Sequence, residues 1–156
     1  MSTQPSDAER AAWHKRFAAE CNNRAWELST AERSAADDRE MLDLAHASAW
    51  HWGKVGTELN RMRATTLLAE VHALLGMGER ALAEAEEMRA YFLARQTPDW
   101  ESAICHAIYA HAAHVAGRAA EHRDAYAQAE AALAAIAGDE DRAVVAATFR
   151  HVPPPA

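Results

Sequence analysis

Histidine is the residue type in this chain that most clearly suggests metal binding or catalysis, since nine of its 156 residues are His. A metal site on helices needs ligands on one face, typically His pairs four residues apart or paired Glu-x-x-His motifs. His46 and His51 are five residues apart, which separates them by about 140° around a helix. His106 and His111 share that spacing, so only His111 and His114 could bind one metal ion from a single helix. We therefore expect no metal site and no cofactor.

The densest unusual feature is a run of His and Trp near residue 50, with the candidate residues His46, Ser48, Trp50, His51 and Trp52. One interpretation is a polar-aromatic binding surface, because indoles offer flat contact area and imidazoles can donate or accept hydrogen bonds. The other is structural, with small residues allowing close helix packing and the Trp pair filling a hairpin corner. We favour the structural interpretation, because aromatic stripes on helices usually face the core.

Motifs for covalent catalysis are missing from the sequence. It contains no Gly-x-Ser-x-Gly elbow, no Gly-rich phosphate loop and no Cys-x-x-Cys. Ser48 lies close to His46 and His51 along the chain, but neighbours on one helix do not by themselves form a catalytic triad. We therefore expect no catalytic residues and a protein that is not an enzyme.

The formal net charge of −7 at pH 7 disfavours binding to nucleic acid or to an anionic membrane, which both need a basic surface. No stretch approaches the ~20 apolar residues that span a bilayer, and the N-terminus lacks the features of a signal peptide. Cys21 and Cys105 each lie in an apolar helical pattern, which favours free thiols in a reducing compartment. These features predict a cytoplasmic protein.

Helices must position the candidate residues, because the composition leaves little else. Half of the residues are hydrophobic, and 40 residues are Ala, whereas only nine are Val or Ile. Ala favours helix, and the β-branched residues that favour strands are scarce. The composition therefore predicts an all-α domain.

Local signals divide the chain into seven helices. A capping box at Ser6 and Glu9 starts the first, Thr57 caps the third, and Thr97-Pro98-Asp99 starts the fifth. We predict helices over 7–33, 37–52, 58–75, 79–95 and 98–116, one after residue 117 and a short last helix from residue 139. Residues 1–6 and the Pro-rich tail 151–156 are expected to be disordered, which leaves a single domain over 7–150.

An internal period indicates stacked helical hairpins. The turn glycines Gly76 and Gly117 are 41 residues apart, and Ala35, 41 residues before Gly76, falls in the first predicted break. We therefore expect about three antiparallel hairpins of similar length and a C-terminal capping helix, a periodicity typical of repeat proteins.

The third and fourth predicted helices resemble a tetratricopeptide repeat. Leu68 and Ala69 occupy the large and small positions of its first helix, Gly76 the turn, and Ala81 and Leu82 the small-large step of its second. Ala and Gly at these positions let helix backbones approach, while Leu fills the remaining gap.

A wider resemblance covers about residues 40–140. The run AHASAWHWG from Ala45, followed by Val55-Gly56-Thr57, Asn60 and Arg63, is similar to the signature AHAS..HW..VGT..N..R of a group of bacterial tetratricopeptide-like proteins of unknown function. The resemblance implies a tetratricopeptide-like fold and a cytoplasmic location, and it assigns no activity.

A tetratricopeptide-like geometry implies a concave groove lined by the first helix of each pair. The register then directs five residues into the groove, namely Arg63, Thr66, Glu70, His111 and His114. The Arg63 guanidinium could bind a carboxylate of a peptide or small molecule, or it could instead pair with Glu58 or Glu70 on a solvated face.

The sequence therefore predicts a non-enzymatic binding or scaffold module for a protein or peptide partner. The terminal helices are apolar enough to pair in a homodimer. An alternative from another class is a small-molecule or metal-dependent function that uses the His/Trp-rich helix 43–52 and the pair His111/His114. A third is a subunit of a larger complex.

Overall fold

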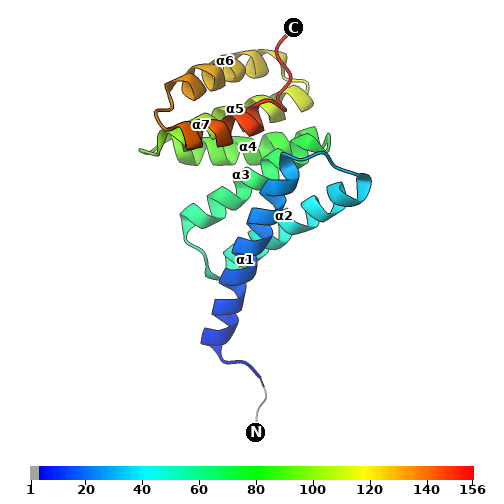
Figure 1. Ribbon diagram of the computed structural model, residues 1–156, viewed down its shortest axis with the longest axis vertical. Helices are drawn as coiled ribbons and strands as arrows, with labels where there is room; N and C mark the ends of the chain where they lie inside the picture. The colour runs from blue at the N-terminus through cyan, green and yellow to red at the C-terminus, as the bar shows by residue number, and fades with distance from the viewer. Residues whose placement is uncertain (1–3) are drawn as a thin grey trace.

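The structure, a computed structural model, describes residues 4–156, and every regular element in that range is a helix. The helices are α1 (Asp7–Ser29), α2 (Ala35–Val55), α3 (Glu58–Leu74), α4 (Gly78–Leu93), α5 (Asp99–Val115), α6 (Ala119–Ala135) and α7 (Asp139–Phe149) (Figure 1). None of these helices is long and apolar enough to cross a membrane.

Consecutive helices pack in pairs, α1 with α2, α3 with α4, and α5 with α6 (Figure 1). Successive pairs are also in contact, because α3 packs on α1 and α2, while α5 packs on α3 and α4. Helix α7 packs on α5 and α6 at the C-terminal end. The chain therefore forms a repeat-like series of helical pairs followed by a final helix.

Side-chain caps explain where three of the helices begin. The capping box predicted at Ser6 and Glu9 is present, and Thr57 accepts from the backbone N–H of Asn60 at the start of α3. A third capping box joins Ser34 and Asp37, so α2 begins at residue 35 rather than 37, and α1 ends at residue 29 rather than 33. The sequence prediction missed it because Asp replaces the Glu or Gln usual at that position.

Glycine is required at three turn positions. Gly76 and Gly117 have φ of 74° and 73°, a conformation that side chains with a Cβ rarely adopt. At Gly78 a Cβ would lie 2.6 Å from the carbonyl oxygen of Val115, so the start of α4 approaches the end of α5 closely. The 41-residue spacing of Gly76 and Gly117 thus reflects the same left-handed turn in two successive pairs.

Alanine forms much of the core. Ala69 and Ala81, at the predicted close crossings, are buried, and so are Ala110 on α5 and Ala129 on α6. Larger buried side chains are few, and the largest are Phe92, Met41, Leu67, Met88, Ile108 and Ile136. The core is therefore a set of thin layers between adjacent helices.

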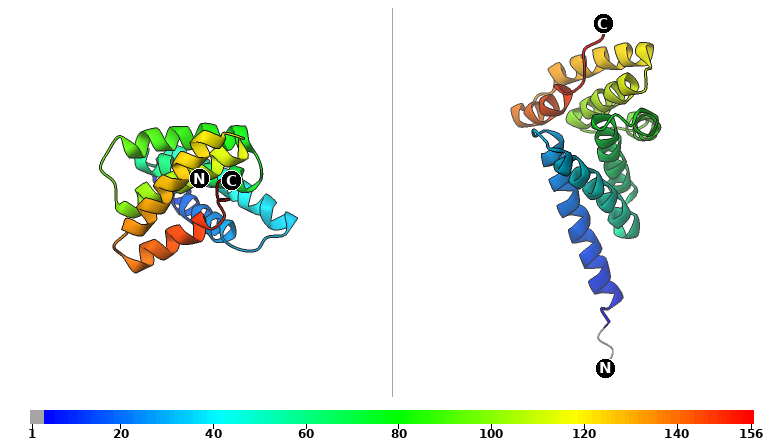
Figure 2. Two further views of the ribbon diagram at one scale, coloured as in Figure 1. Left: turned by 90° about the horizontal axis from the view of Figure 1, so that it is seen from above. Right: turned by 90° about the vertical axis from the view of Figure 1, so that its right-hand side faces the viewer.

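The apolar stripe of α1 is buried only in the second half of the helix. Ala25 and Leu28 are buried, whereas Trp13 and Phe17, on the same stripe, are exposed. Figures 1 and 2 show the N-terminal turns of α1 projecting beyond the other helices. The apolar stripe therefore continues past the end of the surface that could cover it.

The C-terminal segment packs on the body, where the sequence analysis expected a disordered tail. Val152 is buried, and His122 Nε2 donates a hydrogen bond to the carbonyl oxygen of Pro153 at 2.8 Å. At the other end, Ser6 caps α1, and residues 1–3 of the N-terminus expected to be disordered lie outside the described residues.

Candidate functional site

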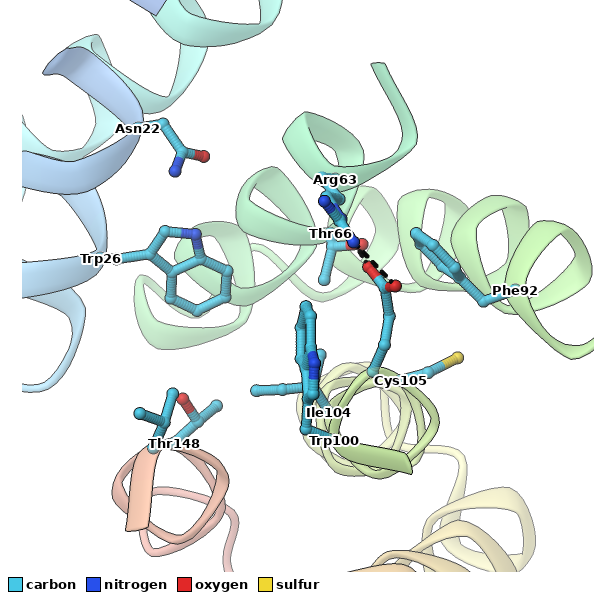
Figure 3. A pocket seen from close by; sticks show the side chains of 11 residues that line it. Asn22, Trp26, Arg63, Thr66, Phe92, Trp100, Ile104, Cys105 and Thr148 are labelled. Carbon is cyan, nitrogen blue, oxygen red and sulfur yellow. Dashed lines mark hydrogen bonds and ion pairs between the residues drawn. The ribbon is translucent and has the colours of Figure 1, made fainter. Parts of the chain in front are cut away.

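A pocket of about 260 Å³ opens between helices α1, α3, α4, α5 and α7. Figure 3 shows side chains from these helices converging on it. Its lining consists of Asn22, Trp26, Arg63, Thr66, Phe92, Trp100, Glu101, Ile104, Cys105, Val144 and Thr148. Most of the residues come from the first helices of the pairs and from α7, and α4 contributes only Phe92.

Aromatic and aliphatic side chains form most of the pocket wall. Trp26 on α1 and Trp100 on α5 point into it from different sides, and Phe92 is buried behind it (Figure 3). Ile104 is also buried, whereas Val144 on α7 is 63 % exposed. The pocket is therefore apolar inside and open to solvent beside α7.

The charged part of the pocket is one ion pair. Arg63 donates from Nε and Nη2 to the two carboxylate oxygens of Glu101, at 2.7 and 3.0 Å. The Arg63 side chain is 43 % exposed and that of Glu101 only 5 %, and the guanidinium lies 5.5 Å from the centre of the Trp100 ring. The hydrogen bonds to Glu101 raise the pKa of Arg63. Of the two ion pairs considered from sequence, with Glu58 or Glu70, neither is formed.

The lining offers no activated nucleophile. Burial raises the pKa of the Cys105 thiol to about 12, so this thiol is neutral at physiological pH. The Thr66 hydroxyl donates to the carbonyl oxygen of Met62 at 2.9 Å, and Thr148 is buried. The arrangement can hold an apolar group.

The structure brings Arg63 and Thr66 into the pocket but buries two other predicted groove residues as a pair. His111 on α5 donates from Nδ1 to Glu70 Oε2 on α3 at 3.0 Å, and both side chains are buried. The second carboxylate oxygen, Oε1, is also buried, without a hydrogen-bond partner among the described residues. Glu70 and His111 thus link two helices.

His114 lies elsewhere. It is exposed, and its ring centre is 4.8 Å from that of His122, beside a second hollow of about 280 Å³ next to the C-terminal segment. His111 and His114 therefore do not converge on a shared ion. Among residues 4–156, no three His, Cys, Asp or Glu side chains are placed to hold one metal ion.

The His/Trp run on α2 combines buried and exposed positions. The Ser48 hydroxyl is buried and donates to the carbonyl oxygen of Ala18 on α1 at 3.0 Å. His51 Nδ1 lies 2.8 Å from His14 Nδ1, a distance at which one imidazole donates to the other. Trp50 is exposed, as is His46, whereas Trp52 is half-buried at the corner before α3.

Sequence reasoning missed several of the residues that form the pocket, although a signal for them was present. Asn22, Arg63 and Ile104 follow one another at intervals of 41 residues, and all three line the pocket. The same offset joins Glu70 to His111. Applying the turn period to Arg63 would therefore have found two neighbours, while Glu101, 38 residues from Arg63, follows no such rule.

The pocket and the 41-residue period are observed in this chain alone, without support from related proteins. No protein-family model matches the chain, and no curated protein and no solved structure matches it either.

Proposed function

We propose that the protein is a non-enzymatic, tetratricopeptide-like binding module whose pocket takes an apolar side chain of a protein or peptide partner. The observation that carries this proposal is the mainly apolar pocket formed by α1, α3, α4, α5 and α7, with the Arg63–Glu101 pair as its charged part. Concave apolar sites with a few placed polar groups are the usual form of binding pockets.

A tetratricopeptide-like stack is supported by the order of helix contacts. Each pair packs on the next, α3 contacts both α1 and α5, and left-handed glycines at Gly76 and Gly117 end the first helix of two pairs. In such a stack the first helices line the concave face, and the first helices of the three pairs supply most of the pocket lining. The proposed cytoplasmic location rests on the sequence alone, that is, on its composition, its two separate cysteines and the resemblance.

The Arg63–Glu101 pair favours a neutral ligand. The pair is complete without a ligand, so a ligand carboxylate would have to displace Glu101 or lie beside it, at a cost in repulsion. Arg63 binds Glu101 through Nε and Nη2, so its Nη1 group can donate to a ligand acceptor. A backbone carbonyl next to an apolar side chain satisfies both features, and we assign this chemistry to the partner.

The size of the effect follows from the buried area. An aromatic side chain buries about 150–250 Å², which contributes about 4–6 kcal/mol at ~25 cal/mol per Å². Loss of translational and rotational freedom offsets most of that gain. One residue alone should therefore bind weakly, and tight binding needs further contacts along a peptide.

Methyl NMR can test the pocket directly, because the chain has three isoleucines and only Ile104 lines it. The probes are the blocked amino acids N-acetyl-phenylalaninamide, N-acetyl-leucinamide and N-acetyl-glutamate amide, added to protein labelled at the Ile δ1 methyl groups. We expect the two apolar probes to shift the Ile104 signal, with small effects on buried Ile108 and Ile136. The acidic probe should shift none of the three.

Filling the pocket provides the matched control. Val144→Trp places a large side chain at an exposed position of the lining and should abolish the shift, whereas Leu93→Trp, at an exposed position on α4, should not. A phage-displayed random peptide library should yield sequences with an apolar anchor on the parent protein and none on Val144→Trp. An Ile104 signal that moves with no apolar probe, or equally with the acidic one, would overturn the proposal.

A further inference from the structure

The projecting part of α1 carries an aromatic surface that the rest of the described chain does not cover. Trp13 is 51 % exposed, Phe17 is 45 % exposed, and Trp50 on α2 is 57 % exposed. Trp13 and Phe17 are four residues apart, so they lie on the same side of α1. Three half-exposed aromatic rings therefore lie at one end of the molecule. Large exposed apolar patches of this kind mark interaction sites.

Histidines hold two of these rings in place. His14 packs edge-on against Trp50, with ring centres 5.3 Å apart, and its hydrogen bond to His51 joins α1 to α2. His51 in turn contacts Phe17 at 5.8 Å and Trp50 at 5.0 Å. The rings of Phe17 and Trp50 therefore pack against His14 and His51. This packing restricts their side chains and reduces the conformational entropy lost when a partner covers them.

We propose that this aromatic surface is covered by a second copy of the chain, with the two α1 helices antiparallel. Charge complementarity carries the choice of occupant. Successive helix residues are about 100° apart, so Glu9 and Arg16 lie about 40° and 60° from Trp13 on the same side of the helix. Within one copy, Glu9 accepts from Ser6 and Arg16 pairs with Glu20, but both interactions are exposed to solvent, so the two charged groups remain accessible to a second copy. A two-fold axis between residues 12 and 13 then sets Glu9 of each copy opposite Arg16 of the other.

The local charge also permits self-association here. The whole chain has a formal charge of −7, which makes two copies repel each other. Residues 7–20, by contrast, contain three acidic and three basic side chains, which cancel. This balance favours a second copy over an anionic membrane, whose attraction depends on an excess of basic residues.

The area fits a dimer of modest affinity. Complete burial of an aromatic residue removes about 150–250 Å² from water, so three half-exposed rings add roughly 300 Å² per copy. Both copies together give about half of the 1,200 Å² at the lower limit of stable interfaces. The exposed turns of α1 around the rings must supply the rest.

Sedimentation equilibrium of the full chain tests the proposal. We expect a concentration-dependent monomer–dimer equilibrium between about 1 and 200 µM, and a dissociation constant at least about tenfold larger for Trp13→Ser. The matched control is Leu93→Ser, which removes a similarly exposed apolar side chain from α4 and should leave the equilibrium unchanged. A parent protein that stays monomeric up to the highest concentration overturns the proposal.

A charge exchange tests the antiparallel arrangement. Arg16→Glu and Glu9→Lys should each associate weakly alone, because each sets like charges against each other across the interface. Glu9→Lys also removes the capping box with Ser6, so circular dichroism must first show that its helix content matches that of the parent protein. An equimolar mixture should form a heterodimer, since both cross-pairs are then opposite in sign. Arg39→Glu, an exposed site on α2, is the control that should have no effect. Failure of the mixture to associate while Trp13→Ser weakens the parent dimer overturns this arrangement.

Binding to lipid vesicles tests the alternative that an anionic membrane, rather than a second copy, covers the aromatic surface. Vesicles of phosphatidylcholine with phosphatidylserine should not bind the parent protein in co-sedimentation, and binding that Trp13→Ser abolishes would overturn the second copy as the occupant. The pocket is a separate site, so Val144→Trp should leave the dimer intact whether or not the proposed ligand chemistry is correct.

Discussion

The buried pair of Glu70 and His111 offers a sharp test of how the helical pairs are joined. The two side chains come from α3 and α5, lie 3.0 Å apart between Oε2 and Nδ1, and are 1 % and 6 % exposed. Glu70→Ala leaves the imidazole buried without its acceptor. We expect this substitution to destabilise the protein strongly, although neither residue touches the pocket.

The magnitude follows from the burial. Leaving a neutral polar group unpaired in the interior costs about 1–3 kcal/mol, and breaking a buried ion pair costs about 3–5 kcal/mol. We therefore expect at least about 2 kcal/mol for Glu70→Ala once the lost packing is included. For a chain of this size, each kcal/mol lowers Tm by about 2–4 °C. Glu70→Gln keeps an acceptor and should cost about 1 kcal/mol.

Urea unfolding at one fixed low protein concentration measures these values, because dimerisation would otherwise contribute to the apparent stability. The double variant Glu70→Ala with His111→Ala closes a thermodynamic cycle, and its cost should fall short of the sum of the single variants. Thr65→Ala, on a less buried side of α3, is the control. Additive costs, or a loss below about 0.5 kcal/mol for Glu70→Ala, would refute the reasoning.

Three further predictions concern the turns, the histidines and the thiol. Gly53→Ala should stabilise α2 by about 0.5–1 kcal/mol, because its Cβ meets no atom within 4 Å. Gly78→Ala should instead destabilise the protein by more than about 1 kcal/mol, because its Cβ meets the backbone of α5. Burial lowers the pKa of His122 and of His151, so the unfolded state binds more protons and stability should fall as pH falls below about 6.5. The buried Cys105 thiol should resist Ellman's reagent at about pH 8 until the protein unfolds.

Each of these predictions has a clear contrary result. Equal effects of the two Ala substitutions on the urea midpoint would contradict the close helix approach at Gly78. A free energy of unfolding that rises between about pH 7 and pH 5.5 would contradict neutral buried histidines, since carboxylates are still largely ionised there. Rapid modification of Cys105 in the folded state would show that the pocket opens deeply enough to admit the reagent.

The sequence predicted helix type and turn positions because these depend on local interactions. Alanine propensity, the capping box at Ser6 and the left-handed glycines act within a few residues, so their effects can be read without a fold. The start of α2 was predicted two residues too late. The cap at Ser34 is also a local interaction, but it uses Asp37 where the usual capping box has Glu or Gln.

The candidate site was only partly predictable. The tetratricopeptide-like register predicted that Arg63 and Thr66 share one face of their helix, and both residues line the pocket. The sequence could not show that Glu70 and His111 bind each other. Whether facing side chains of adjacent helices contact each other or solvent depends on the distance between the helices. That spacing is set by packing along the whole helix.

By itself, the sequence determined an all-helical chain with left-handed turns 41 residues apart, because propensities and glycine conformations are local properties. Tertiary structure alone decided that Arg63 binds Glu101 and that Trp13 and Phe17 remain exposed. The physical reason is that hydrophobic periodicity identifies the apolar face of a helix but not the extent of the surface opposite it. Helix α1 extends beyond the helices that cover it (Figure 2), so the aromatic residues of its N-terminal turns remain exposed.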